Sequence, residues 1–270
     1  MNIKKSISSN KVSQLYDELL VTEQKIRPNN FYPIYKILHF DEPTCSDIYQ
    51  WIDNNIGLPV SGVILDAGCG IGWGSAYLAS QTQAKVTGIS ISSSEINFAI
   101  AHTQADNLGF TLMSFDDVLA SEYSMIIAIE SVKHSLNISE TIRILVESLK
   151  PMGQLIIVDD FYVNNMDDVL QEGDNSQFRS DWQLNDILSC EHLPSEGAGL
   201  SITKHDLTGL MSPQYSLLAK CKHILVAALL LIKPHDLGWQ AFRGGYLLEK
   251  LYLKQKMRYK VIVLQKGKDV

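Results

Sequence analysis

Four glycines occupy every second position in the segment VILDAGCGIGWGS (63–75), directly after an apolar run that ends in an acid. Glycine permits positive φ angles and lets a ligand approach the backbone closely. The run follows a predicted buried strand and opens a predicted helix, where an open α/β sheet offers unpaired backbone amides to its ligand. The spacing therefore predicts a ligand-binding turn made by Gly68, Gly70 and Gly72, with Asp66 beside it. The alternative is a tight strand-to-helix turn that binds nothing.

Trp73 distinguishes between the ligands that such a turn can hold. A dinucleotide site needs the spacing G-x-G-x-x-G, which from Gly68 and Gly70 would require glycine at the position of this tryptophan. Asp66 would also direct a negative charge at two phosphates, and no G-K-[ST] follows that would make a P-loop. A phosphate-free ligand with a cationic end fits better, because the acid then attracts it.

A histidine that could serve as a base follows another predicted strand. In IIAIESVKHS (126–135), His134 stands four residues after Glu130, past the carboxyl end of the strand predicted at 125–129. Transfer to an oxygen or carbon acceptor often needs a base near neutral pH, and histidine suits that task. The alternative is a structural histidine in the turn into the next helix. Tyr16, from the N-terminal region, either assists this base or packs within a lid.

Short β-branched runs alternate with helical segments from residue 63 onward, which predicts a parallel sheet covered on both faces. We expect strands at 63–65, 85–89, 110–114, 125–129 and 154–158, and helices around 73–82, 93–107 and 139–150. Ser139 is the expected N-cap of the last helix, and Pro151 its end.

The flanking regions read as additions to this core. We expect short helices in 1–60, then a helix at 182–193, a strand at about 200–207, helices at 213–232 and 238–254, and a closing edge strand at 258–266. The run ILVAALLLI (224–232) falls far short of the roughly 20 residues that a membrane helix needs, and it predicts a buried helix.

Composition narrows the class of partner. The net charge of −7 argues against nucleic acid as the main partner, since phosphate neutralisation needs a basic surface. Four widely spaced cysteines without a C-x-x-C pair favour a reducing compartment, and a polar start argues against a signal peptide, so we expect a cytoplasmic protein. The histidines lack metal-ligand spacing, and we predict no metal.

The segment LDAGCGIGWGS resembles motif I of the class I S-adenosylmethionine-dependent methyltransferases. The resemblance continues in order through VTGISIS (86–92), SFDD (114–117), IIAIESVKHS (126–135) and LKPMGQLIIVDDF (149–161). It implies a Rossmann-like, doubly wound, seven-stranded α/β sheet. We expect a helical lid at 1–60, a cofactor-binding core at 61–160, a helical insert at 161–255 that caps the substrate, and the closing strand at 256–270.

The resemblance also implies roles for single residues. S-adenosylmethionine would lie on the glycine turn, with Asp66 reaching its ammonium group through water and Ser90 standing where the family commonly has a ribose-binding acid. Branches with similar GITLS- or GVTLS-like segments include the cyclopropane-fatty-acid synthases. Asp116 would accept the adenine amino group, unless the two aspartates only cap a turn. The cofactor-binding residues expected in this way are Asp66, Gly68, Cys69, Gly70, Gly72, Trp73, Ser90, Ile91, Ser92, Asp116, Asp117, Glu130 and Ser131, and the catalytic ones are His134 and Tyr16.

Three hypotheses for function follow from the resemblance. The first is a methyltransferase that acts on oxygen, nitrogen or carbon of a small, largely apolar metabolite held in a closed chamber. The second is a C-methyltransferase or cyclopropane-synthase-like enzyme acting on a lipid or isoprenoid. The third is a protein that binds S-adenosylmethionine without turnover. A homodimer is compatible with each, and no membrane span is expected.

Overall fold

The computed structural model describes residues 3–26, 47–118, 123–163, 173–197, 199–210 and 217–268. Among these residues, one seven-stranded sheet has the order β3-β2-β1-β4-β5-β7-β6. Strands β1 to β5 run parallel to one another, whereas β7 is antiparallel to both β5 and β6. The strands are β1 Val63–Ala67, β2 Lys85–Ser90, β3 Leu108–Leu112, β4 Tyr123–Ile129, β5 Leu149–Tyr162, β6 Leu200–Asp206 and β7 Met257–Lys266. The predicted seven-stranded, Rossmann-like α/β fold is confirmed.

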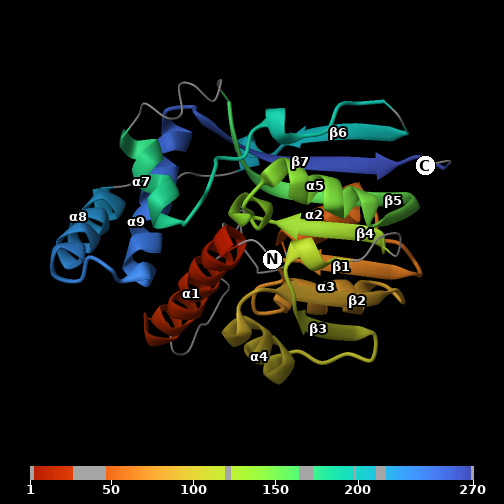
Figure 1. Ribbon diagram of the computed structural model, residues 1–270, viewed down its shortest axis with the longest axis horizontal. Coiled ribbons are helices and arrows are strands. Elements are labelled where there is room, and N and C mark those ends of the chain that lie inside the picture. Colours follow the sequence, from red (N-terminus) through yellow and green to blue (C-terminus); the bar gives the residue numbers. More distant parts are fainter. Residues whose placement is uncertain are drawn as a thin grey trace.

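Helices cover both faces of the sheet and extend beyond the carboxyl ends of its parallel strands (Figure 1). Helices α2 and α3 pack on one face and α5 on the other, while α1, α7, α8 and α9 form a group at one side of the molecule. The helices are α1 Ile3–Ile26, α2 Asp47–Asn55, α3 Trp73–Gln81, α4 Ser93–His102, α5 Ile138–Glu147, α7 Gly173–Asp181, α8 Leu217–Ile232 and α9 Leu237–Leu253.

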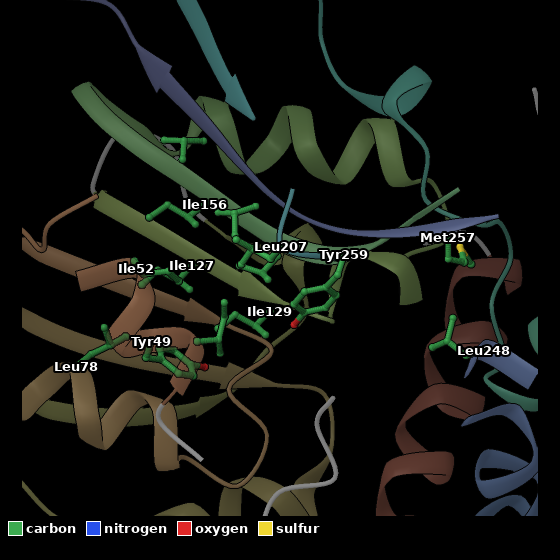
Figure 2. Close-up of a cluster of buried hydrophobic side chains, with 14 of the residues drawn as sticks. Tyr49, Ile52, Leu78, Ile127, Ile129, Ile156, Leu207, Leu248, Met257 and Tyr259 are labelled. Carbon is green, nitrogen blue, oxygen red and sulfur yellow. The ribbon is translucent and has the colours of Figure 1, made fainter. Parts of the chain in front are cut away.

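The core consists of two layers because successive side chains of a strand point to opposite faces. In β5, Ile156 and Val158 face the layer beneath α2 and α3, and Leu155 and Ile157 face the layer beneath α5. Figure 2 shows side chains of the first layer, which come from α2, α3, β4, β5, β7 and α9, with Tyr259 between Tyr49 of α2 and Leu248 of α9. Both faces of the parallel strands are buried, which explains their nearly continuous apolar sequence.

Several local predictions were wrong. Residues 182–193 form turns and a short 3₁₀ helix at Cys190–His192 instead of an α-helix, and the apolar Ile187 and Leu188 are buried from an irregular backbone. Helix α5 is capped by the Asn137 side chain and not by Ser139. The closing strand β7 is no edge strand, since it lies between β5 and β6.

The prediction of a buried helix at ILVAALLLI was also wrong for most of its residues. Val226 and Leu230 are buried, but Ile224, Leu231 and Ile232 are 65%, 86% and 79% exposed. An apolar run alone does not distinguish a helix enclosed on all sides from one that packs on one side only. Within the described part of the chain, no helix is both long and apolar enough to cross a membrane.

Candidate active site

A cavity of about 310 Å³ lies at the carboxyl ends of β1, β2 and β4, where α1 borders it. Open α/β sheets bind their ligands at this end of the strands. The described residues that line it are Val12, Tyr16, Gly68, Gly70, Ile89, Ser90, Ile91, Glu95, Met113, Ser114, Phe115, Asp116, Asp117, Ile129, Glu130, Ser131, His134, Ser135, Leu136 and Thr141. None of these comes from 161–255, so the described part of the predicted insert does not border this cavity.

The glycine turn divides into positions that face the cavity and positions that pack. Gly68 has a φ of 87°, lines the cavity, and would bring an added Cβ to 2.4 Å from the Ser131 Cβ. Gly72 also has a positive φ, but an added Cβ there would meet Ala99 and Phe110. Gly68 is therefore required for an open cavity floor, and Gly72 for close packing of the turn.

Among the predicted cofactor residues, Gly68, Gly70, Ser90, Ile91, Asp116, Asp117, Glu130 and Ser131 lie together around the cavity. Asp66, Cys69, Gly72, Trp73 and Ser92 are not among its described lining residues. Trp73 begins α3 and is 38% exposed, while Cys69 is buried. Their predicted cofactor contacts stay predictions.

Asp66 lies beneath the turn and is fully buried. Ser75 Oγ donates a hydrogen bond of 2.6 Å to its Oδ2, and the Tyr49 hydroxyl approaches both carboxylate oxygens at 3.2 and 3.3 Å. Burial raises the pKa of Asp66 to about 6, although the hydrogen bonds from Ser75 and Tyr49 oppose that shift. The Asp66 carboxylate thus links the end of β1 to α3 through Ser75 and to α2 through Tyr49.

Glu95 is a candidate binding residue that the sequence reasoning missed. Ser90 Oγ donates to its Oε2 at 2.7 Å, and both side chains line the cavity. Ser92 instead caps α4 by accepting from the Glu95 amide, and its hydroxyl donates to Asp17 of α1. Burial raises the pKa of Glu95 to about 7. The sequence signal that could have revealed Glu95 is Ser90, which stands at the end of β2 where an acid was expected. Glu95 of α4 places a carboxylate beside this serine.

Asp116 and Asp117 lie in a short 3₁₀ helix, Phe115–Asp117, that borders the other end of the cavity. Ser114 provides the side-chain cap of this helix by accepting from the Asp116 amide. Capping is therefore done by the serine, and both aspartates contribute to the cavity wall.

Tyr16 and His134 meet at the cavity. The Tyr16 hydroxyl is 2.8 Å from His134 Nε2, and the two rings are arranged edge to face. Burial and then the charge of Lys133 lower the pKa of His134 to about 3, while the backbone of Trp182 acts in the opposite direction. Burial raises the pKa of Tyr16 well above its ordinary value. Both side chains are thus neutral at neutral pH. The imidazole keeps a lone pair, which makes it a hydrogen-bond acceptor, but its lowered pKa makes it a weak base.

A buried cluster of charges lies next to this pair. Lys133 Nζ is 3.0 Å from Asp159, 3.3 Å from Asp160 and 3.8 Å from Glu130. The Tyr259 hydroxyl donates to Glu130 at 3.0 Å, and the Tyr252 hydroxyl donates to Asp160. Asp159 and Asp160, near the carboxyl end of β5, are therefore the counterions of Lys133.

Glu130 belongs both to this cluster and to the cavity wall, and its φ of 50° is unusual for a residue other than glycine. Backbone strain of this kind concentrates at functional sites. Among the described residues, no group of three or more histidine, cysteine, aspartate or glutamate side chains is arranged to hold a metal ion.

Comparison with known proteins gives the class of this domain. Residues 60–208 match the family described as a methyltransferase domain. The match covers more than half of the chain, which therefore belongs to this methyltransferase domain family.

One curated relative is also a methyltransferase by name. Methyltransferase GfsG of Streptomyces halstedii is 31% identical over 135 residues, which cover 47% of this chain and 47% of that protein. The match thus spans about half the length of that relative.

Solved structures share the fold over nearly the whole chain. The [4+2]-cyclase SpnF has a TM-score of 0.71 at 17% identity, with 96% of each chain covered. Geranyl diphosphate C-methyltransferase from Streptomyces coelicolor A3(2), solved with Mg²⁺, geranyl diphosphate and S-adenosyl-L-homocysteine, has a TM-score of 0.67 at 14% identity, with 96% of this chain and 98% of that one covered. At these identities the likeness concerns the fold.

Proposed function

We propose that this chain is an S-adenosylmethionine-dependent methyltransferase that methylates oxygen, nitrogen or carbon of a small molecule. The observation that carries the proposal is the Tyr16–His134 pair at 2.8 Å on a cavity bordered by the glycine turn. Family membership supports the activity, and the complex of geranyl diphosphate C-methyltransferase with S-adenosyl-L-homocysteine supports the cofactor.

The cavity residues fit the parts of this cofactor. Gly68 leaves room for its methionine part, since any side chain at that position would fill the space toward Ser131. Ser90 and Glu95 form a hydrogen-bonding pair suited to the ribose hydroxyls, and the carboxylates of Asp116 and Asp117 are acceptors suited to the adenine amino group. Asp66 would act on the ammonium group through water, because its side chain does not border the cavity.

When bound, the cofactor supplies an electrophilic methyl group on a positively charged sulfur. The protein's task is to align an acceptor with that methyl group and to take away its proton. We propose that Tyr16 contacts the acceptor and that His134 Nε2 takes up a proton through the tyrosine hydroxyl. The cofactor would supply the methyl group and keep the electron pair of the broken bond on its sulfur. The acceptor's proton would pass through the Tyr16 hydroxyl and His134 Nε2 to solvent, because an imidazole with a pKa of about 3 does not retain it at neutral pH.

An unsaturated carbon acceptor would use the same pair at a later stage. Methylation of an alkene leaves a carbocation, and the proton is lost after the new carbon–carbon bond has formed. Val12, Met113, Ile129 and Leu136 give this cavity the apolar wall that either kind of acceptor would need. The identity of the acceptor therefore separates the first two hypotheses.

Isothermal titration with S-adenosylhomocysteine tests the binding part of the proposal. We expect binding by the wild-type chain and weaker binding by Gly68→Ala. Absence of binding by a folded wild-type chain would overturn the assignment of the cavity. Binding without methyl transfer to any component of a metabolite extract would instead favour a non-catalytic cofactor-binding protein.

A further inference from the structure

Helix α8 presents an apolar surface to solvent. Val226 and Leu230 pack toward α9 and are each 6% exposed. Ile224 and Leu225 are 65% exposed, Leu231 is 86% exposed, and Ile232 and Leu229 are also exposed. Most monomeric proteins scatter such residues singly, and a contiguous group marks an interaction surface.

These residues share one side of the helix. At about 100° per residue, the helical repeat places positions 224, 225, 228, 229, 231 and 232 on the sector opposite Val226 and Leu230. Cys221 is exposed and falls on the same sector. In Figure 1, α8 is the outermost helix of its group, on the far side of α9 from the sheet. We call this sector the outer face of α8.

The charged residues in the sequence of α8 and just after it have one sign. Lysines occupy positions 220, 222 and 233, and the sequence contains no aspartate or glutamate from 211 to 235. The helical repeat places positions 220 and 233 at the two margins of the apolar sector. Lys233 is exposed directly after the helix. This is the pattern of an amphipathic helix with basic margins, although the chain as a whole carries a net charge of −7.

Two other occupants fit less well. A second copy of the chain would place outer face against outer face in a two-fold contact, which brings lysines together with no acid on the helix to pair them. No described residue of α8 lines the cavity at the strand ends, so the outer face lies apart from that cavity.

We propose that α8 docks the protein on an anionic lipid bilayer, with its outer face inserted at the boundary of headgroups and acyl chains. At 16 residues the helix is about 24 Å long, too short to span a hydrocarbon core of roughly 30 Å, but long enough to lie in the interface plane. Leucine and isoleucine side chains supply buried apolar area, Lys233 contacts the phosphate groups, and the two lysines in the helix sequence add positive charge. The protein thereby associates with the membrane surface from one side.

Vesicle flotation tests the proposal directly. The full chain should float with vesicles containing phosphatidylglycerol and much less with vesicles of phosphatidylcholine alone, and about 0.5 M salt should weaken binding because the lysine contribution is screened. The double variant Leu231→Glu, Ile232→Glu should lower binding at least about tenfold. The matched control is Ile100→Glu on α4, an exposed isoleucine outside the outer face, which should bind like the wild type.

A second readout locates the contact. Anionic vesicles should protect Cys221 from a water-soluble maleimide, as measured on the peptide by mass spectrometry. Circular dichroism and cofactor titration on the same variants establish folding and an intact cavity, so a loss of docking is distinguishable from a failure of the proposed function. No flotation of the wild type, or equal flotation of the double variant, would overturn the proposal. A double variant that only turns a dimer into a monomer would assign the outer face to self-association.

Discussion

The Tyr16 hydroxyl lies 2.8 Å from His134 Nε2, although 118 positions separate the two residues in the sequence. Tyr16 belongs to α1, while His134 follows β4, so the contact joins α1 to the region beyond the carboxyl end of β4. The contact between Ser92 and Asp17 fixes the same helix to α4. Helix α1 is thus positioned by polar contacts on two sides of the cavity.

Removal of either member of this pair should reduce turnover. We expect His134→Ala and Tyr16→Phe to lower kcat by about 10²–10⁴-fold while cofactor affinity changes little, because proton acceptance matters in the transition state. His102→Ala on α4 is the matched control, since that histidine is exposed. Full activity of His134→Ala with a hydroxyl or amine acceptor would contradict a catalytic role and indicate that this histidine is structural.

The protonation state of His134 can be measured without an acceptor. Because burial lowers its pKa to about 3, its ring resonances should not titrate between pH 5 and pH 8, where an exposed histidine titrates near 6.5. The free energy of unfolding should also decrease as pH falls below about 6.5, because His134 binds a proton in the unfolded chain but not in the folded one. Nuclear magnetic resonance of labelled histidine, assigned with His134→Gln, checks the first point. A normal titration would contradict it.

Glu95 should make cofactor binding pH-dependent. Burial raises its pKa to about 7, so its carboxylate becomes a full acceptor for hydroxyl groups as pH rises through that value. Affinity for S-adenosylhomocysteine should therefore increase from pH 6 to pH 8 in the wild type, and Glu95→Gln should remove most of that increase. Calorimetry at several pH values is the measurement. An unchanged slope in the variant would assign the dependence to another group, with Asp66→Asn as the next variant to compare.

Gly68 should tolerate no side chain. An added Cβ meets Ser131 at 2.4 Å on a backbone with φ 87°, so Gly68→Ala should weaken cofactor binding at least about tenfold and lower stability by roughly 1 kcal/mol. Gly109→Ala is the control, because open space surrounds the position of its Cβ. Equal cofactor affinities in the two variants would remove Gly68 from the binding turn.

Lys133 should be needed for stability. Replacement by methionine leaves Asp159 and Asp160 buried near each other without their cation, which should cost about 3 kcal/mol in the free energy of unfolding at pH 7. Burial already raises the pKa of Asp159, and without Lys133 protonation would relieve the repulsion, so the loss should shrink toward pH 5.

Urea unfolding at both pH values measures this dependence. Arg143→Met is the comparison, because its ion pairs with Glu140 and Glu147 are exposed and its loss should change little. A loss for Lys133→Met that is the same at pH 7 and pH 5 would contradict the assigned charge balance.

The sheet was predictable because its parallel strands are buried on both faces and so appear as short apolar runs. The structure of residues 182–193 was not predictable in this way. The spacing of their apolar residues resembles that of a helix, but Ile187 and Leu188 are buried from an irregular backbone. Glu95 was missed because its place on the cavity wall depends on how α4 brings it back to Ser90. The exposed side of α8 was missed because an apolar run says nothing about which of its sides has a neighbour.

The most direct test of the proposed activity is incubation with methyl-labelled S-adenosylmethionine and a metabolite extract, followed by mass spectrometry of the products. We expect the wild-type chain to form a labelled small molecule, and His134→Ala to form it at least about 10²-fold more slowly. A folded wild-type chain that binds the cofactor yet labels no component of extracts containing hydroxyl, amine and alkene acceptors would contradict it.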